Sequence, residues 1–443
     1  MPRVTYRDAL ASLAASSQRG MRLGLASTRA LCAALNNPQE QLRGVLVAGT
    51  NGKGSVAAMV AQVAASAGYR VALLTKPHLT SYRERIRLGG DPISELGFSQ
   101  LVDQVLAASS RVDAAVGGPT HHELLTAMGF LAARDWGAQL TVCEVGLGGR
   151  LDATNIWDGG VAVVTSVGLD HQAQLGDTIP AIAAEKAAII KPGDLAVSGV
   201  GAEALPVVRE RADSVGARLW QLGDQVRVEE IPDSGRGRLR LNVVTERRSL
   251  PLLTLGVAGQ FQLSNAGVAV AVADCLGDLG FPIPDAAIRE GLASVRWAGR
   301  MESLGGAPRV FVDAAHNPPA VAAILEDLRV LVRRHPTVLL FGSMGDHDHR
   351  SMLELLAALD FAAVVLTQSR STRAVAPGQL LREWGRPAEV VATSELGLER
   401  ARQLAGSQGQ VLALGSIYLV GEVMAALGVG LAPDPEVPFQ PQW

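Results

Sequence analysis

The sequence predicts an α/β protein in which parallel sheets are covered by helices on both faces. One observation is that short, continuous apolar runs alternate with helical patterns. In the first part of the chain these runs lie at residues 45–48, 71–74, 140–145 and 161–167. Continuous runs are typical of strands that are buried on both faces. The other observations are a glycine-rich turn after the first run and a second series of runs beyond residue 297.

The glycine-rich turn reads Gly-Thr-Asn-Gly-Lys-Gly-Ser at residues 49–55, and residues 56–67 then fit a helix. Glycines let backbone N–H groups approach an anion, and a helix N-terminus adds roughly half a positive charge. Lys53 can reach the terminal phosphates of a nucleotide, and Ser55 can ligate magnesium. Gly54 departs from the common GxxxxGK[ST] pattern, which has Ser or Thr directly after the lysine. The string still favours nucleotide binding over a purely structural turn.

Further elements follow in order. Helices are predicted over residues 101–109 and 124–133. Residues 217–255 differ, because turn residues at 232–237 precede an alternating run, which predicts an antiparallel hairpin at the sheet edge. A helix rich in small residues is expected at about 263–276.

A domain junction is expected near residues 297–301, where the alternating pattern starts again. We therefore predict an ATP-binding domain at 1–297 and a smaller Rossmann-like domain at 298–443. The second domain lacks a G-x-G-x-x-G fingerprint, so a dinucleotide is not implied. The tail at 432–443 is expected to be peripheral. The strands are predicted at 310–313, 338–341, 363–367, 390–392 and 411–414, and the helices at 319–332 and 350–359.

Composition narrows the class of protein. No run of eighteen or more apolar residues occurs, so a membrane span is not expected. Three scattered cysteines and a mixed, charged N-terminus favour a cytoplasmic protein with reduced thiols. The net charge of −3 and the lack of a basic tail do not suggest nucleic-acid binding.

Lysine is rare in this chain. Arginine carries the positive charge almost everywhere, and the few lysines are Lys53, Lys76, Lys186 and Lys191. An ammonium group can contact phosphate as a point charge and can lose its proton when buried. We expect such roles for Lys53 and Lys186. Lys191, which precedes a proline, can simply cap a helix C-terminus, and the role of Lys76 stays open.

Polar residues gather where the predicted strands end, the edge at which open α/β sheets bind ligands. Glu144 ends one strand and suits a magnesium contact. The loop at 146–155 is rich in glycine and polar residues, which favours a ligand-contacting loop over a plain turn. Asp170 and His171 follow the next strand, and metal ligation by His171 competes evenly with a structural role. A helix predicted at 178–190 carries Glu185 and Lys186. These two residues can also simply lie on a solvent-exposed face of that helix.

Together, residues 49–55, 144–155, 170–171, 185–186 and 313–318 resemble the folylpolyglutamate synthase/dihydrofolate synthase family of ATP-dependent Mur ligases. The likeness extends from residues 22–25 to 415–421. It implies a P-loop-containing, Mur-ligase-like central domain with a parallel sheet and a smaller C-terminal Rossmann-like domain.

The resemblance also implies residue roles. ATP would be held by Asn51, Gly52, Lys53, Gly54, Ser55, Asn265, Arg300 and Asp313. Two magnesium ions would be held by Ser55, Glu144, His171 and Lys186. Lys186 would carry a carbamate (N6-carboxylysine), and His316 would lie beside Asp313 in the catalytic centre, with Lys53. The pterin would contact Arg22, Leu23, Gly24, Leu25, His122, Leu151, Asp152 and Ala153.

Two positions depart from the family pattern. Lys76 stands where the family has a serine that contacts magnesium. An ammonium group cannot ligate a metal, but it could supply positive charge to a phosphate. His122 stands where the family tends to have an aromatic ring, so it either replaces that ring or makes the pocket more polar.

The implied activity is addition of L-glutamate to dihydropteroate and to reduced folates through an acyl phosphate, by a monomer. The segment at 151–153 favours both activities. The alternatives are polyglutamate synthesis alone, a cell-wall Mur ligase, a nucleotide-binding protein without ligase chemistry, and an inactive paralogue.

Overall fold

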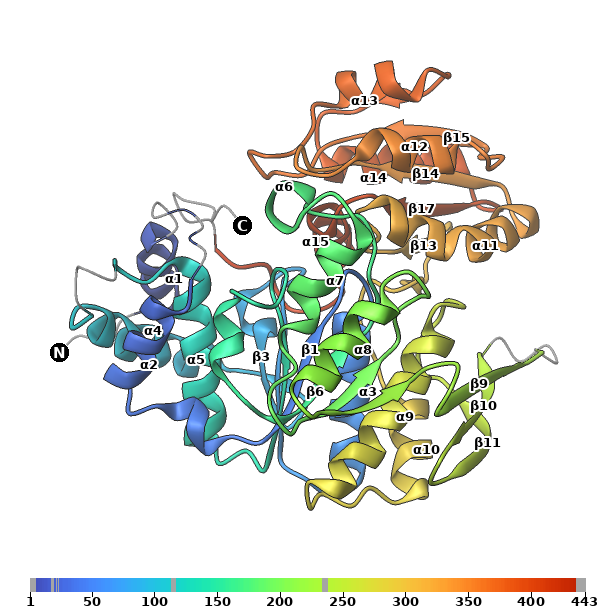
Figure 1. The fold of residues 1–443 in the computed structure, drawn as a ribbon. Coiled ribbons are helices and arrows are strands. Elements are labelled where there is room, and N and C mark those ends of the chain that lie inside the picture. Colours follow the sequence, from blue (N-terminus) through green and yellow to red (C-terminus); the bar gives the residue numbers. More distant parts are fainter. Residues whose placement is uncertain are drawn as a thin grey trace.

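The computed structural model describes residues 5–16, 20, 22, 24–112, 117–232 and 238–435. The described strands form a large sheet, a small antiparallel sheet and a third sheet near the C-terminus. In Figure 1 the larger N-terminal unit lies below the smaller C-terminal unit. Within these ranges, no helix combines the length and the apolar character that crossing a membrane requires.

The large sheet has the strand order β4-β3-β2-β5-β1-β6-β7-β8. Strand β1 lies in its interior and pairs in parallel with β5 and β6, which confirms the predicted buried parallel strands. Only the short strands β3 and β4 run antiparallel to their neighbours in the described part of this sheet. The bounds are β1 (Gly44–Ala48), β2 (Val71–Leu74), β3 (Ile86–Leu88), β4 (Asp91–Pro92), β5 (Leu140–Glu144), β6 (Gly160–Val164), β7 (Leu195–Ser198) and β8 (Arg218–Gln221).

Helices cover both faces of the large sheet (Figure 1). Leu46 and Ala48 of β1 pack with α1, α2, α4, α5, α7 and α8, whereas Val45 and Val47 pack with α3, α9 and α10. The alternation along one strand therefore feeds two separate cores. The helices are α1 (Tyr6–Ala15), α2 (Ala26–Ala34), α3 (Lys53–Ser66), α4 (Glu95–Ser109), α5 (His121–Trp136), α6 (Gln172–Leu175), α7 (Ile179–Ala187), α8 (Leu205–Ser214), α9 (Gln262–Asp278) and α10 (Asp285–Ser294), with short 3-10 turns η2 (Pro38–Gln41), η3 (Tyr82–Arg85) and η5 (Ala153–Ile156).

The predicted hairpin at the sheet edge is wrong in one respect. Strands β9 (Val226–Ile231), β10 (Arg240–Thr245) and β11 (Ser249–Thr254) form a separate antiparallel sheet, and only β8 joins the large one. Leu241 and Val243 are buried in the core that contains α9, so the apolar face of this small sheet packs on a helix. The predicted turn lies mostly outside the described residues, because 233–237 are not among them.

The C-terminal unit contains a six-stranded sheet of order β12-β13-β17-β14-β15-β16. Helices α11, α12 and α13 pack on one face, and α14 and α15 pack on the other. The bounds are β12 (Glu302–Ser303), β13 (Arg309–Val312), α11 (Pro318–Arg334), β14 (Thr337–Phe341), α12 (His349–Leu356), β15 (Ala363–Leu366), α13 (Pro377–Trp384), β16 (Glu389–Val390), α14 (Ser394–Ala405), β17 (Gln410–Leu414) and α15 (Ile417–Ala426).

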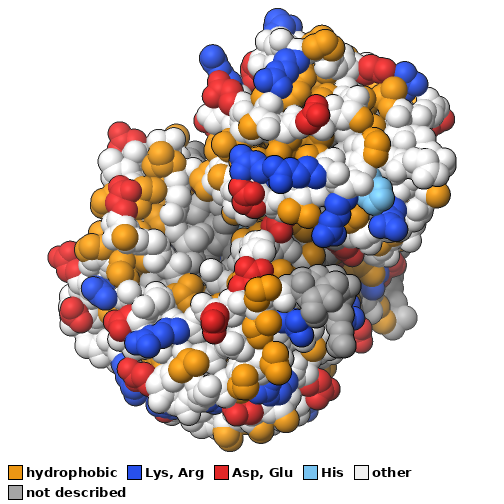
Figure 2. All heavy atoms as spheres, turned by 90° about the vertical axis from the view of Figure 1, so that its right-hand side faces the viewer, with side chains coloured by type: hydrophobic (Ala, Val, Ile, Leu, Met, Phe, Trp, Pro, Cys, Tyr) orange, Lys and Arg blue, Asp and Glu red, His pale blue; other side chains and the backbone are white. Residues whose placement is uncertain are grey.

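The domain boundary between residues 297 and 298 stays a prediction, and it falls in the link between α10 and β12. The tail predicted to be peripheral returns instead to the N-terminal unit, where the Asp434 carboxylate is bonded by Tyr6 and Ser81. Residues 436–443 lie outside the described ranges. On the face drawn in Figure 2, basic and acidic side chains are interspersed over both units.

Candidate active site

The turn at residues 49–52 joins β1 to α3, and only glycine fits at its two ends. Gly49 has φ 152° and Gly52 has φ 84°, a range that favours glycine. A Cβ on Gly49 would lie 2.0 Å from Thr165 Oγ1, and one on Gly52 would lie 2.7 Å from Asn265 Oδ1. The turn therefore leads closely into the N-terminus of α3, whose free N–H groups suit a phosphate.

Residues after β6 hold this turn in place. Thr165 Oγ1 and Ser166 Oγ donate to the Asn51 carbonyl at 2.7 Å and 2.9 Å. The Asn51 N–H donates back to Ser166 Oγ at 3.0 Å. The strand predicted to reach residue 167 ends at Val164. The Thr165 N–H still bonds the Ala48 carbonyl of β1 at 2.9 Å, but the side chains of Thr165 and Ser166 bond the turn.

Two lysines converge on one carbonyl of the turn. Lys53 Nζ donates to the carbonyls of Gly49 and Thr50, each at 3.0 Å. Lys186 Nζ, from α7, donates to the same Gly49 carbonyl at 3.1 Å. Lys186 is only 4% exposed, and burial together with the charge of Lys53 lowers its pKa to about 7. A substantial fraction of this amine is therefore neutral at neutral pH.

Two buried side chains near the turn carry oxygen atoms that could ligate a metal ion. Ser55, in the first turn of α3, accepts a hydrogen bond from Gln262 Nε2 at 3.3 Å. Glu144 ends β5, beside β1, and accepts the Lys76 backbone N–H at 3.1 Å. Burial raises the pKa of Glu144, and Lys53 is the main group that lowers it. A buried carboxylate with this one hydrogen bond among the described residues fits the oxygen-ligand chemistry of a divalent cation.

A histidine cluster lies where the two units meet. Asp170, after β6, accepts Asn317 Nδ2 at 2.7 Å. The His347 ring lies 5.8 Å from that of His171 and 4.9 Å from that of His316, measured between centroids. Sequence reasoning missed His347. The signal was available, because it follows the predicted strand at 338–341, at an edge where ligands bind.

Asn317 also ties the phosphate turn to the C-terminal unit. It is 1% exposed and caps α11. Its Oδ1 accepts Asn51 Nδ2 at 3.1 Å, and its own Nδ2 donates to Asn51 Oδ1 at 3.3 Å. The pair brings the two units together at the glycine-rich turn.

The predicted nucleotide contacts Arg300 and Asp313 flank this junction. Asp313 accepts the backbone N–H groups of Met301 at 2.8 Å and Ala315 at 2.7 Å, so its carboxylate organises the link as it stands. Burial raises the pKa of Asp313, and Arg300 lowers it. Arg300 also lowers the pKa of Glu144. Its guanidinium is therefore near carboxylates of both units.

Among the predicted pterin contacts, Asp152 is the centre of a dense set of hydrogen bonds. Its Oδ2 lies 2.9 Å from His122 Nε2 and accepts the N–H groups of Gly146 at 3.1 Å and Leu147 at 3.0 Å. Its Oδ1 accepts Thr154 N–H and Oγ1 at 2.9 Å and 2.6 Å. Burial alone would raise the pKa of Asp152, but His122, Lys76 and these bonds bring it well below its usual range. The carboxylate thus folds the glycine-rich loop.

The other predicted pterin contacts lie on neighbouring elements. Arg22 donates to the Gly118 carbonyl at 2.5 Å, and Gly24 and Leu25 lead into α2. That helix packs against α5, whose first turn carries His122. Leu151 and Ala153 flank Asp152. Leu23 lies outside the described residues.

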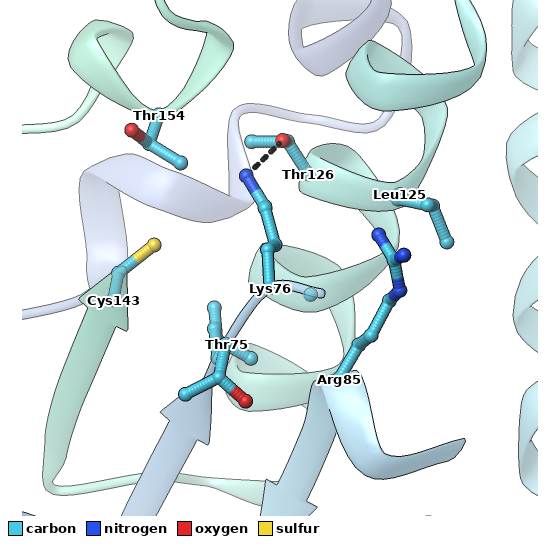
Figure 3. Close-up of a pocket in the computed structure, with 9 residues that line it drawn as sticks. Thr75, Lys76, Arg85, Leu125, Thr126, Cys143 and Thr154 are labelled. Carbon is cyan, nitrogen blue, oxygen red and sulfur yellow. Dashed lines mark hydrogen bonds between the residues drawn. The ribbon is translucent and has the colours of Figure 1, made fainter. Parts of the chain in front are cut away.

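The Lys76 side chain bonds α5, near the predicted pterin contacts, and not the turn at residues 49–52. Its Nζ donates to Thr126 Oγ1 of α5 at 3.2 Å, as Figure 3 shows. The side chain lines a small cavity of about 10 Å³, together with Thr126, Cys143 and Thr154. That volume holds about one water molecule, so the cavity is not a substrate pocket. Lys191 donates to Asn155 Oδ1 and to the Ile189 carbonyl, which lies beyond the last residue of α7, Ala187, so Lys191 does not bond a terminal carbonyl of that helix.

Comparison with known proteins supports one family over the whole chain. A model described as "Mur ligase, glutamate ligase domain" matches residues 299–417. The Bacillus subtilis dihydrofolate synthase/folylpolyglutamate synthase is 31% identical, covering 95% of this chain and 99% of its own length. Escherichia coli FolC in complex with DHPP and ADP has a TM-score of 0.87 at 27% identity, covering 97% of this chain and 99% of that one.

A second solved structure agrees. Mycobacterium tuberculosis folylpolyglutamate synthase complexed with ADP has a TM-score of 0.86 at 28% identity, covering 96% of this chain and all of that chain (100%). The predicted fold class is thereby confirmed, as a Mur-ligase-like α/β fold with a smaller C-terminal unit. Because the likeness extends over nearly the full length of both chains, this protein belongs to the folylpolyglutamate synthase/dihydrofolate synthase family of Mur ligases.

Proposed function

We propose that the protein is an ATP-dependent ligase that adds L-glutamate to dihydropteroate and to reduced folates, releasing ADP and phosphate. The names of the relatives and the DHPP and ADP complex of E. coli FolC support this activity. The observation that carries it is the convergence of Lys53 and Lys186 on the Gly49 carbonyl, with Glu144 ending the strand beside it.

ATP binds at the turn and across the junction of the units. The turn and the first helical residues, from Asn51 to Ser55, cradle the phosphates, with the Lys53 ammonium as the point charge. Asn265 is close to this turn, since a Cβ on Gly52 would meet its side chain. Arg300 and Asp313 approach the nucleotide from the link and the C-terminal unit. The domain division at residues 297 and 298 belongs to the same proposal.

Magnesium fits the donors that are present. Ser55 and Glu144 offer hard oxygen ligands, and His171 and a modified Lys186 complete the set that we assign to two ions. Magnesium usually keeps several waters and binds through substrate phosphates plus one or two protein carboxylates, so a cage of protein ligands is not needed. When bound, it neutralises charge on the phosphates.

Lys186 is the residue that we assign to N6-carboxylysine. Carbon dioxide adds to a neutral amine, forming an N–C bond and releasing one proton. A pKa of about 7 makes the neutral amine available. The product is an anion beside the Lys53 ammonium, where a negative charge is stabilised.

The reaction needs two displacements. An oxygen of the acceptor carboxylate attacks the γ-phosphorus of ATP, ADP leaves, and Lys53 stabilises the charge that spreads over the phosphoryl oxygens. The amine of L-glutamate then attacks the acyl carbon, phosphate leaves, and the amine gives up a proton. His316 is neutral, since burial and His347 lower its pKa to about 4. With Nδ1 held by the Ala314 carbonyl, its Nε2 can accept a hydrogen bond from the incoming amine.

The pterin acceptor lies on the side of the turn where Asp152 and His122 meet, within reach of Arg22, Gly24, Leu25, Leu151 and Ala153. The C-terminal unit over the turn excludes water from the acyl phosphate. The proposal includes a monomer that acts on small molecules in the cytoplasm, without nucleic-acid or membrane partners. The buried free cysteines agree with a reducing compartment.

Steady-state ADP release tests this proposal. ADP should form only when ATP, L-glutamate and a pterin acceptor are all present. ADP release without glutamate would favour a nucleotide-binding protein that lacks ligase chemistry. Turnover with a nucleotide-linked muramyl substrate instead of a pterin would favour a cell-wall ligase.

A further inference from the structure

Within the described residues, the chain passes between the two units twice. Residues 295–301 form the first connection, between α10 and β12. After α15, the C-terminal strap (residues 428–435) leaves the C-terminal unit and runs back to the N-terminal one, as the red trace in Figure 1 shows. A body joined at two points can rotate only about the axis through both. The strap therefore restricts how the units move relative to each other.

The strap is anchored by one carboxylate. Asp434 Oδ1 accepts Tyr6 Oη at 2.6 Å and Ser81 Oγ at 2.7 Å, and Oδ2 accepts the Tyr82 N–H at 2.7 Å. The Asp434 N–H donates to the Thr80 carbonyl at 3.2 Å. Three of these partners belong to the bridging segment (residues 76–84), which runs from the end of β2 into η3. Hydrogen bonds to a charged acceptor are stronger than neutral ones, so this is a specific attachment.

The bridging segment is built to move as a unit. The carboxylate of Glu84 accepts the N–H groups of Leu79, Thr80 and Ser81, each at 2.9 Å. Such a set of bonds to one side chain fixes the backbone of residues 79–84. A displacement of Ser81 or Tyr82 therefore moves the rest of the segment with it.

The segment also contacts the C-terminal unit directly. Leu79 packs against the core that contains Val420, Val423 and Met424 of α15. A Cβ on Gly421 would lie 2.0 Å from the Leu79 carbonyl oxygen, so the helix backbone approaches the segment as closely as glycine allows. Leu79 and Asp434 thus hold the segment between α15 and the strap.

The far end of the segment reaches the proposed active site. The Lys76 N–H donates to Glu144 Oε2 at 3.1 Å, and the Lys76 side chain bonds Thr126 on the acceptor side. Resting on the function proposed above, we infer that Asp434 is a positioning residue: it fixes the bridging segment so that Lys76 meets Glu144 when the C-terminal unit is seated. Attachment of the strap through Asp434 then determines whether Glu144 is correctly placed.

The first variant is Asp434→Ala in the full chain. We expect kcat to fall between about 10-fold and 100-fold, which is the cost of displacing a positioned group. The KM for ATP should change less than about twofold, because the strap bonds Tyr6 and residues 80–82 and not the phosphate turn. Asp213→Ala, at an exposed aspartate of α8, is the matched control and should keep wild-type kcat.

A second readout separates positioning from general stability. Amide hydrogen exchange of residues 78–84, measured with ADP present, should become faster in Asp434→Ala and stay unchanged in Asp213→Ala. Tyr6→Phe removes only one hydroxyl and should give a smaller effect of the same kind if Asp434→Ala fails to fold. The Tyr6→Phe/Asp434→Ala double variant should match Asp434→Ala alone, because both changes break the same attachment.

The inference is overturned if kcat falls without faster exchange in residues 78–84, or if exchange rises without a fall in kcat, or if neither changes. Failure of the proposed function is a different outcome. In that case wild-type protein releases no ADP with any pterin acceptor, whereas the exchange comparison still tests whether Asp434 holds the segment.

Discussion

Lys53 and Lys186 share one hydrogen-bond acceptor, the Gly49 carbonyl, at 3.0 Å and 3.1 Å. One lysine comes from the helix after the turn, and the other from α7 on the opposite face of the sheet. Two ammonium groups this close repel each other, and burial adds to the penalty. The pair therefore favours either a bound anion or loss of charge at Lys186.

Lys186→Ala should lower kcat by at least about 100-fold, the scale on which loss of a charge-stabilising group acts. ADP affinity should change little, because the phosphate turn is left intact. Lys191→Ala is the matched control, since Lys191 lies in the same part of the chain but bonds Asn155 and the Ile189 carbonyl and not the turn. Carbon-13 NMR with labelled bicarbonate should detect a carbamate in wild-type protein and none in Lys186→Ala. A wild-type spectrum without it would refute the modification.

The depressed pKa of Lys186 predicts a pH dependence of stability. The folded pKa is about 7 and the unfolded value is 10.5, so the unfolded chain binds more protons between these values. The free-energy penalty that the buried Lys186 amine imposes on folding is therefore at its full value below pH 7, and it decreases as pH rises toward 10.5. The stability advantage of Lys186→Met over wild type should narrow from pH 7 to pH 9.5, measured by urea unfolding in carbon-dioxide-free buffer. A constant difference would contradict the assigned pKa.

Gly54 departs from the usual P-loop pattern for a reason that the structure supplies. A Cβ on Gly54 would lie 3.0 Å from Trp297 Nε1 in the link between the units. Gly54→Ala should therefore destabilise the protein by about 1 to 3 kcal/mol, as overpacking usually does. Gly277→Ala, in α9 with open space around its Cβ position, should instead be neutral or stabilise by up to about 1 kcal/mol. Chemical denaturation measures both, and equal effects would rule out the Trp297 contact.

The sequence was sufficient for the central strands β1, β2, β5 and β6 and for β13, β14, β15 and β17, because residues in these parallel strands are apolar on both faces, but it did not indicate β7 or β8. It was also sufficient for the phosphate turn, whose residues are contiguous. Local patterns could not indicate that β9 to β11 form their own sheet, because alternation is the same for an edge strand and a separate sheet. Nor could they reveal that Asp152 bonds His122, Gly146, Leu147 and Thr154, or that Asn51 meets Asn317, since such pairs depend on tertiary packing.

Asp152→Asn should destabilise the protein by about 3 kcal/mol at pH 7, because it removes a buried charge from its partners. The folded pKa of Asp152 lies below the unfolded value of 3.8. Its contribution is therefore complete above about pH 4 and is lost as pH falls further. The difference in unfolding free energy between wild type and variant should be constant from pH 5 to 8 and become smaller near pH 3.5. The exposed Asp177→Asn serves as the control, and a difference in unfolding free energy that is no smaller at pH 3.5 than at pH 5 would contradict this account.

Mass spectrometry of the pterin product tests the central claim most directly. Purified protein is incubated with ATP, magnesium and L-glutamate, together with either 7,8-dihydropteroate or tetrahydrofolate. The account predicts that each acceptor gains glutamate, with one ADP formed per glutamate added. Gain on tetrahydrofolate alone would contradict the bifunctional assignment, and no gain on either acceptor would contradict the proposed ligase activity itself.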